Sequence, residues 1–329
     1  MRHAVRIPKL KILGLFAPLL LFGLLLPRPV RAGGEMPDAK DILSPVTDLF
    51  PKYKHMGPGR QRLLNQDASS LEGLSKPFTF DVLGDTRTGY HIYGKLVSMM
   101  AKDAPAFVMN TGDTVFDPGD PVEWDRFVEL SKPLKMPYMI APGNHDISGK
   151  KTEEIFREDV NQPGKEVYYS FTAADLLFVA LDSEQVKDVS KVNGEQLKWL
   201  EGVLKASKER FKFVFLHRPL YPSKDVGEHY GDSMNEYTED RDRLEKLLKE
   251  YGVDAVFAGH EHLYSRKEVD GIVHVITGGG GAPLYARDKD GGFYHYIRAT
   301  ADGDSVSFEV VGIDGKIKDT FTITKDGAR

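Results

Sequence analysis

The chain has 329 residues, of which 41% are hydrophobic and 28% charged, a balance that excludes a disordered chain and fits one large or two small folded domains. Its formal net charge is −5, and it becomes −11 if residues 1–32, which hold six basic and no acidic residues, are removed, so general nucleic-acid binding is not expected. The chain contains no cysteine, which excludes disulfides, thiolate ligands and a cysteine nucleophile and restricts a metal site to oxygen and imidazole nitrogen.

Residues 1–32 have the pattern of a signal peptide. A basic start precedes the apolar run Ile12–Leu26, and Val30-Arg31-Ala32 matches a cleavage site, which predicts export to the periplasm or the outside of the cell and no membrane span after cleavage. The alternative is an uncleaved membrane anchor, but the apolar run is shorter than the roughly 20 residues that a spanning helix needs. Residues 33–76 are rich in Pro, Gly and polar groups and predict an extension or linker, with a short helix near Arg60–Gln66.

From residue 77 to residue 329 the pattern predicts one α/β domain, because short apolar runs alternate with helical patterns. The predicted strands are Phe78–Leu83, Ala106–Met109, Pro137–Ala141, Val167–Phe171, Leu176–Leu181, Phe211–Leu216, Val253–Ala258 and Ile272–Ile276. Asn193, with Gln196 three residues later, predicts the start of one helix, and Thr238 and Gly252 predict the limits of another.

The C-terminal third predicts an antiparallel portion packed beside the α/β part. The expected strands, joined by short turns, are Phe293–Ala299, Ser305–Ile313 and Thr320–Ile323.

Five of the predicted strands run directly into polar residues of metal-ligand type. These ends are Gly84-Asp85, Asn110-Thr111-Gly112-Asp113, Pro142-Gly143-Asn144-His145-Asp146, His217 and Gly259-His260-Glu261-His262. Sites in open α/β sheets form at the carboxyl ends of strands, so these side chains are expected to meet at one edge. Each pattern taken alone is more typical of a turn, a helix cap or a hydrogen-bonded histidine, and the argument rests on the whole set and its order.

Two aspartates, one asparagine and three imidazoles suit divalent or mixed-valence Mn, Fe, Zn or Co. Two such ions about 3.5–4 Å apart need a bridging carboxylate and share a hydroxide that attacks phosphorus in line. The composition of the set therefore suits a centre with two metal ions whose shared hydroxide attacks phosphorus.

The ordered motifs resemble those of the calcineurin-like metallophosphoesterases, which include the purple acid phosphatases. The resemblance covers roughly residues 77–280 and implies a four-layer α/β/β/α sandwich with mixed sheets. It also implies roles by position. Asp85 and His262 hold metal 1, Asp113 bridges both ions, and metal 2 is completed by Asn144, His217 and His260. His145 corresponds to the catalytic histidine of the family, oriented by Asp146.

Two positions depart from the family pattern. Most members have a histidine where this chain has Arg87, and purple acid phosphatases have a tyrosine where it has Phe116. Metal 1 thus loses its usual additional ligand and is expected to bind weakly, and Phe116 excludes an iron–tyrosinate colour. Arg87 cannot ligate a metal as a permanent cation, and the alternatives for it are a fork onto a substrate phosphate or a salt bridge to a local carboxylate.

Other segments carry weaker patterns. Gly278–Pro283 lacks the Gly-Lys-Ser/Thr of a phosphate-binding P-loop and instead predicts a backbone that passes close to the metal site or a neighbouring loop. Tyr221–Glu236 is either a lid over the substrate or a solvated surface loop. Tyr264 and Arg266 either line the pocket or are ordinary strand residues.

The sequence therefore predicts an exported phosphoric ester hydrolase. The main alternative is a catalytically degenerate member of the same fold that binds phosphate or a partner. A diesterase specific for a sugar, lipid or nucleotide is a third reading, which the motifs do not separate from a monoesterase.

Overall fold

The computed structural model of the protein describes residues 68–160, 163, 166–223 and 232–325. The predicted signal peptide and the predicted helix near Arg60–Gln66 lie outside these residues. In the part of the chain that is described, no helix is both long enough and apolar enough to cross a membrane.

The first of two sheets combines strands from both ends of the domain, in the order β12-β11-β10-β1-β2-β3. Its strands are β1 (Phe78–Leu83), β2 (Phe107–Asn110), β3 (Tyr138–Ile140), β10 (His295–Asp302), β11 (Ser305–Gly312) and β12 (Ile317–Thr324). The first three are parallel, and β10 joins β1 in the antiparallel direction, with Val82 opposite Ile297. The antiparallel C-terminal strands were predicted correctly, but they extend this sheet through backbone hydrogen bonds instead of packing beside it.

The second sheet has the order β4-β5-β6-β7-β9-β8. Its strands are β4 (Tyr169–Ala173), β5 (Leu176–Ala180), β6 (Phe211–Phe215), β7 (Ala255–Ala258), β8 (Tyr264–Val269) and β9 (Ile272–Thr277). The four strands β5, β6, β7 and β9 are parallel, and β4 and β8 close the edges in the antiparallel direction. β8 was not among the predicted strands because its sequence, YSRKEV, is polar, as an exposed edge strand tolerates.

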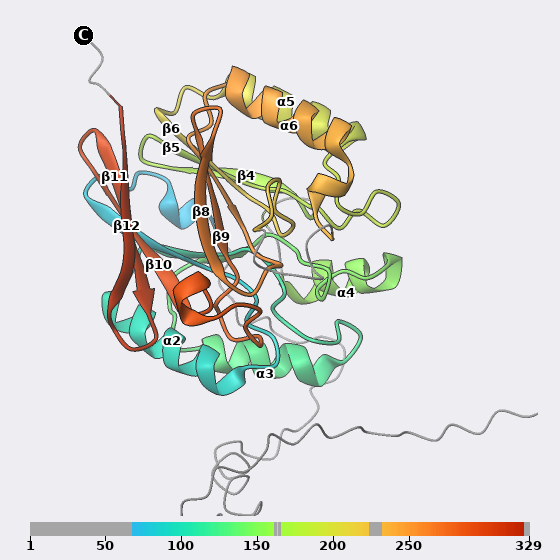
Figure 1. Ribbon diagram of the computed structural model, residues 1–329, viewed down its shortest axis with the longest axis vertical. Coiled ribbons are helices and arrows are strands. Elements are labelled where there is room, and N and C mark those ends of the chain that lie inside the picture. Colours follow the sequence, from blue (N-terminus) through green and yellow to red (C-terminus); the bar gives the residue numbers. More distant parts are fainter. Residues whose placement is uncertain (1–67, 161–162, 164–165, 224–231, 326–329) are drawn as a thin grey trace, which may run out of the picture. The chain divides into compact units, whose positions relative to one another are not determined.

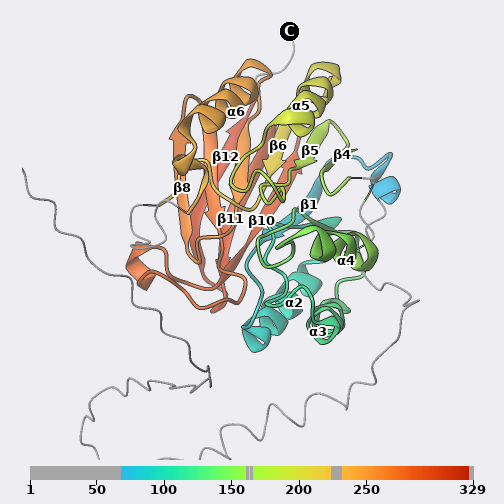
Figure 2. The same ribbon diagram turned by 90° about the vertical axis from the view of Figure 1, so that its right-hand side faces the viewer.

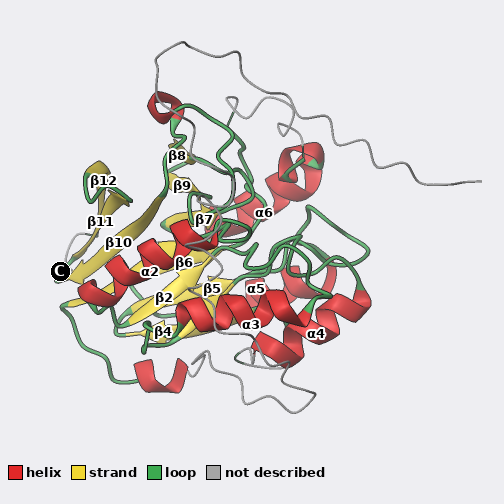
Figure 3. Cartoon of the chain, turned by 90° about the horizontal axis from the view of Figure 1, so that it is seen from below, coloured by secondary structure: helices red, strands yellow, loops and turns green. Residues whose placement is uncertain are grey.

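Among the described residues, five α-helices cover the outer faces of the two sheets, which gives the expected four layers. They are α2 (Tyr90–Asp103), α3 (Pro121–Ser131), α4 (Lys150–Val160), α5 (Gly194–Ala206) and α6 (Thr238–Glu250). The helices α2 to α4 pack on the first sheet, and α5 and α6 pack on the second. Figures 1 and 2 show α5 and α6 on the side of the paired sheets opposite α2 and α3, and Figure 3 shows α2 and α3 from their outer side.

Both predicted helix starts form helices, but their capping differs from the expectation. Asn193 precedes α5 without a hydrogen bond from its side chain, and Gln196 instead exchanges two hydrogen bonds of 2.7 and 2.8 Å with the backbone of Asp182. Gln196 therefore ties α5 to the end of β5, a long-range contact that outcompetes the local capping box. At α6, Thr238 is the first helical residue, and Gly252 follows the helix with φ +67°, as its role as a stop requires.

A layer of phenylalanines fills the space between the two sheets. Phe80 of β1 stacks on Phe107 of the same sheet at 5.2 Å and meets the edge of Phe178 of the second sheet at 5.1 Å. Further rings extend the layer from both sheets: Phe171, Phe213, Phe215, Phe257 and Phe308. Leu71, at the end of the short 3-10 helix η1 (Ala68–Leu71), packs into this same core. The apolar layer holds the sheets face to face.

We predict that Phe80→Ala lowers the free energy of unfolding by about 3–5 kcal/mol, because it removes a fully buried ring from the centre of this layer. Denaturation in urea measures the change. Ile317→Ala, on the edge strand β12 and 44% exposed, is the matched control and should stay within about 0.5 kcal/mol of the parent protein. Equal effects of both substitutions would contradict this account of the core.

Candidate metal centre

The polar residues that follow the five strands come together, but they come from two sheets. Asp85, Asp113 and Asn144 follow β1, β2 and β3 of the first sheet. His217 follows β6 of the second sheet, and the segment His260–His262 follows β7. The expectation of a single sheet edge was therefore wrong in this respect: the candidate site spans the carboxyl ends of two sheets packed face to face.

Three of these residues have a left-handed backbone. Asp85, Asp113 and His260 have φ values of 58°, 57° and 69°. This conformation costs roughly 1–2 kcal/mol for a residue with a Cβ and persists only where surrounding contacts fix it. One such contact is the hydrogen bond of 2.9 Å that the Asp85 N–H donates to the Gly112 carbonyl. The strained turns direct the three side chains into the space between the sheets.

Two glycines let the ligand residues approach each other. A Cβ on Gly143 would lie 2.4 Å from Asp113 Oδ1, and a Cβ on Gly259 would lie 2.4 Å from Asp85 Oδ2. Both distances are shorter than carbon and oxygen tolerate without bonding, so any other residue at these positions would displace the carboxylates.

Four side-chain atoms lie close together, and one of them is His217 Nε2. This atom lies 3.0 Å from Asn144 Oδ1, 3.2 Å from His260 Nδ1 and 3.3 Å from Asp113 Oδ1, and Asn144 Oδ1 is 3.0 Å from His260 Nδ1. Ligand atoms that share one ion at about 2.1 Å lie about 3.0–3.4 Å from each other in octahedral or tetrahedral geometry. The spacing of these four atoms therefore fits a single divalent ion.

The protonation of the two histidines supports this fit. His217 Nδ1–H donates to the Thr111 carbonyl at 2.9 Å, which leaves a lone pair on Nε2, and burial lowers the pKa of His217 to about 4, so the ring is neutral. His260 Nε2 lies 3.5 Å from Asp232 Oδ2, an acceptor for the proton of that nitrogen. Its Nδ1 is then also available to a metal. In this tautomer the lone pairs of the two histidines face each other, and a bound cation would offset their repulsion.

Asp113 stays ionised in this cluster. Burial by itself raises the pKa of Asp113, but the permanent charge of Arg87 and the hydrogen bond from the His145 backbone help to hold the pKa below its ordinary value. Its Oδ1 also accepts the backbone N–H of His145 at 2.9 Å. One of the four converging atoms, Asp113 Oδ1, therefore carries negative charge.

The residues expected to hold metal 1 lie beside this cluster. Asp85, Asp113 and His217 form a group whose possible ligand atoms all lie within 4.8 Å of one another. His262 Nε2 is 3.4 Å from Asp85 Oδ1, and its Nδ1–H donates to the Pro283 carbonyl at 2.6 Å. Arg87 occupies the same place: its Nε donates to Asp113 Oδ2 at 3.0 Å, and its Nη2 lies 3.3 Å from His262 Nε2. The salt bridge to a local carboxylate, one of the two alternatives for Arg87, is present in the structure, and the fork onto a substrate phosphate stays a prediction.

Asp146 has a different contact from the one expected. It was predicted to orient the ring of His145, but its carboxylate accepts the backbone N–H groups of Asp113, Thr114 and Gly143 at 2.8–2.9 Å and the Thr114 hydroxyl at 2.5 Å. These bonds join the loops after β2 and β3. Asp146 thus positions the ligand loops, and the ring of His145 is held by another residue.

Phe116 holds the ring of His145. His145 Nδ1–H donates to the Phe116 carbonyl at 2.7 Å, and the two rings stack at 5.3 Å. The Phe116 side chain is 53% exposed. Sequence reasoning noticed Phe116 only as a missing ligand, because a contact through a backbone carbonyl leaves no pattern in the sequence.

Arg218 is a further residue that the sequence did not single out. It is buried next to His217, pairs with the buried Glu184 at 2.8 Å and with Asp232 at 2.7 Å, and has Nη1 3.5 Å from His260 Nε2. Its partners lie 34 and 14 residues away along the chain, so only the folded structure identifies this network behind the ligands.

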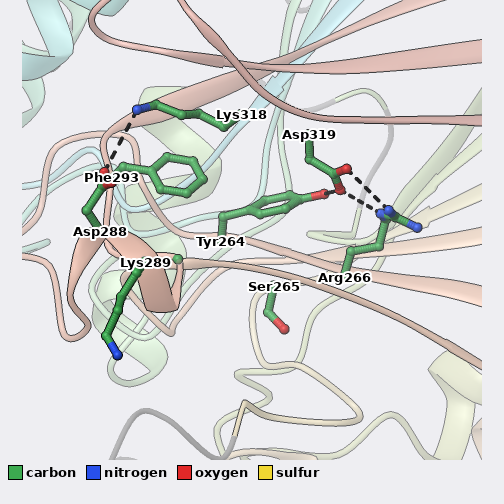
Figure 4. A pocket seen from close by; sticks show the side chains of 9 residues that line it. Tyr264, Ser265, Arg266, Asp288, Lys289, Phe293, Lys318 and Asp319 are labelled. Atoms are coloured by element: carbon green, nitrogen blue, oxygen red, sulfur yellow. Dashed lines mark hydrogen bonds and ion pairs between the residues drawn. The ribbon is translucent and has the colours of Figure 1, made fainter.

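The weaker sequence patterns have mixed outcomes. The glycine-rich segment passes close to a ligand loop, as predicted, since Gly280 N–H donates to the Gly84 carbonyl at 2.8 Å. Half of the proposed lid Tyr221–Glu236, residues 224–231, lies outside the described residues. Tyr264 and Arg266 both contact Asp319 in a separate cavity of about 460 Å³ (Figure 4), which none of the six candidate ligands lines. They are strand residues of β8.

The comparison with known families agrees with this geometry. The family model of the calcineurin-like phosphoesterases matches residues 78–264. The chain belongs to this family. The resemblance predicted from the motifs is thereby confirmed.

Several curated proteins are similar to the chain. Purple acid phosphatase 5 of Arabidopsis thaliana is 29% identical over 266 residues, covering 75% of this chain and 62% of that protein. Probable inactive purple acid phosphatase 1 of the same plant is 29% identical, covering 67% of this chain and 43% of that protein. A nucleotide pyrophosphatase/phosphodiesterase of Hordeum vulgare is 28% identical, covering 67% of this chain and 72% of that protein. The chain spans about half the length of the Arabidopsis relatives.

Solved structures share the fold. A purple acid phosphatase from yellow lupin (Lupinus luteus) seeds superimposes with a TM-score of 0.65 at 22% identity, covering 78% of this chain and 55% of that chain. A dimetal phosphatase from Danio rerio superimposes with a TM-score of 0.55 at 16% identity, covering 76% of this chain and 99% of that chain. The four-layer sandwich is therefore the fold of this family.

We predict that Mn²⁺ or Zn²⁺ stabilises the chelator-treated protein, by about 2.7 kcal/mol when the free ion is at 100 times its dissociation constant. The ion would neutralise the repulsion among the converging atoms. Thermal denaturation against metal concentration measures the effect. Asn144→Ala should weaken binding at least about ten-fold, whereas Asn193→Ala, whose side chain makes no capping hydrogen bond, should not change it. Unchanged binding by Asn144→Ala would contradict this ligand set.

A second prediction concerns His295, which is buried beneath the glycine-rich segment and whose ring stays neutral there. Burial lowers the pKa of His295 to about 4, below its ordinary value of about 6.5. Between pH 6.5 and 4 the unfolded chain therefore binds a proton that the folded chain does not, so His295 makes stability fall as the pH falls through this range. Its contribution to the slope is at most about 1.4 kcal/mol per pH unit. Urea denaturation between pH 6.5 and 4.5 should show a smaller slope for His295→Gln, and an unchanged slope would contradict a neutral buried ring.

Proposed function

We propose that the protein is an exported, metal-dependent phosphoric ester hydrolase that acts on a small phosphate ester. The observation that carries the proposal is the convergence of Asp113, Asn144, His217 and His260 on one point in a phosphoesterase fold. Export is part of the proposal and rests on the sequence of residues 1–32. The net charge and the absence of a basic stripe in the sequence favour a small substrate over a nucleic acid.

In this proposal Asp113, Asn144, His217 and His260 hold a divalent ion, with Mn, Fe, Zn and Co as the candidates. A bound ion of this kind lowers the pKa of a coordinated water towards roughly 7 and polarises a phosphoryl oxygen. A second ion, as the resemblance implies it, would need Asp85 and His262 as ligands, and Arg87 contacts both His262 and Asp113.

His145 is the proposed proton donor. Its Nδ1–H is used by the Phe116 carbonyl, so Nε2 is the ring nitrogen that remains for an oxygen of the substrate. The ring is partly exposed and backed by Phe116, which fixes its plane. From this position it can protonate the leaving oxygen, a role that suits an imidazole near neutral pH. Asp146 supports the reaction indirectly by fixing the loops that carry Asp113 and His145.

A catalytically degenerate protein that binds phosphate or a partner is the second candidate. Arg87 favours it, because it pairs with Asp113 and His262 where a second ion is expected. The retention of the other ligand-type residues and of His145 favours hydrolysis. A relative whose name describes it as probably inactive shows that both outcomes are to be considered in this family.

We predict that the metal-loaded protein hydrolyses a simple phosphomonoester or phosphodiester and that Asp113→Ala lowers turnover at least about a hundred-fold, because it removes a charged ligand from the centre. Steady-state kinetics with both substrate types, together with metal analysis of each variant, test this. Asp242→Ala, which alters an exposed aspartate paired with Arg241, is the control and should leave turnover unchanged. Turnover that survives Asp113→Ala would refute the proposed mechanism, and no turnover with any metal would favour the binding protein.

A further inference from the structure

Arg87 occupies the space in which the family resemblance places a second metal ion. Its guanidinium bridges two of the three side chains assigned to that ion, with Nε on Asp113 Oδ2 at 3.0 Å and Nη2 at 3.3 Å from His262 Nε2. The side chain is only 13% exposed. We propose that the centre is mononuclear and that the guanidinium of Arg87 takes the place of metal 1.

The position of Arg87 is fixed by its backbone as well as by its side chain. Its N–H donates to the Asp113 carbonyl at 3.1 Å, while its Nε donates to the carboxylate of the same residue. Arg87 and Asp113 are therefore joined at two points. Departure of the guanidinium from the site would leave the buried Oδ2 of Asp113 without this charged partner, which is unfavourable away from water.

His262 is prepared to accept a hydrogen bond from Arg87. Its Nδ1–H is used by the Pro283 carbonyl at 2.6 Å, so Nε2 carries the lone pair that faces Arg87 Nη2. Stacking of the ring on Tyr285, at 4.1 Å, fixes its plane. The lone pair that a metal would use is thus directed at a permanent donor of hydrogen bonds.

Asp85 has a structural contact that does not need a metal. Both of its carboxylate oxygens lie within hydrogen-bond distance of the His260 N–H, at 3.0 and 3.1 Å. This contact holds the left-handed turn at His260, which directs the imidazole to the other ion. All three residues assigned to metal 1 therefore have defined partners with Arg87 in place.

Charge also favours one ion. Asp85 and Asp113 are the two carboxylates among the assigned ligands, and one divalent ion together with Arg87 already exceeds their negative charge. A second dication beside the guanidinium would be repelled by it, and a partly buried site screens this repulsion less than water does. One ion and one guanidinium supply two positive centres for a phosphate, of which only one can be removed by a chelator.

The inference shares one assumption with the proposed function, namely that an ion binds at Asn144, His217 and His260. The number of metal ions bound per chain tests the inference without a measurement of activity. The full chain is loaded with Mn²⁺, free ion is removed, and bound manganese is measured by elemental analysis and by electron paramagnetic resonance. The parent protein should hold about one ion per chain, with the spectrum of an isolated Mn²⁺, and Arg87→His should hold about two, with the spectrum of a coupled pair, since ions about 3.5–4 Å apart interact.

Arg266→His is the matched control, because Arg266 pairs with Asp319 outside the candidate site. It should remain at one ion per chain. Two coupled ions in the parent protein would overturn the inference whether or not the variants fold. One ion in the parent protein without phosphoesterase activity would support the mononuclear centre and refute the proposed function. Two ions in the parent protein with phosphoesterase activity would support the proposed function and refute the mononuclear centre.

Discussion

The candidate site depends on the contacts made by the carboxylate of Asp113. One oxygen faces His217 from the opposite sheet and accepts the His145 N–H, and the other accepts Arg87. The backbone of the same residue is held by Asp146 from the next loop. A buried negative charge at this point requires a charged partner and hydrogen-bond donors, which Arg87 and the His145 N–H supply.

The fold satisfies this requirement through its apolar interior. The phenylalanine layer around Phe80 holds the two sheets face to face, so that the ends of β1, β2 and β3 lie opposite the ends of β6 and β7. Left-handed turns and closely approached glycines then direct the ligands inwards. The strain in these turns is compensated by hydrogen bonds within the loops, which explains why the loops are rich in polar contacts. Stability of the sandwich and geometry of the site are therefore coupled.

Arg87 distinguishes this chain from the family pattern. A metal ion and an arginine side chain both attract a phosphate group, but they differ in two properties. A metal ion can be exchanged or removed and activates water, whereas a guanidinium is a permanent part of the chain and only donates hydrogen bonds. A centre with one of each would retain the attraction for phosphate on both sides but would concentrate water activation on an ion at Asn144, His217 and His260. The same substitution links the hydrolase and the binding protein as candidate functions, because phosphate binding persists in both.

The sequence by itself determined every described strand except β8, the order of the polar strand ends and hence the family, because apolar runs and the residues that end them are local patterns. It also predicted the six residues that the structure brings together. It did not determine that the strand ends belong to two sheets, since pairing such as that of β1 with β10 joins residues far apart in the chain. Nor did it determine the partners of Asp146, Gln196 and Arg87, which contact backbone groups or side chains up to 175 residues away. A local pattern carries no record of such contacts, and only the packing of the two sheets decided that Arg87, rather than open space, lies between Asp113 and His262.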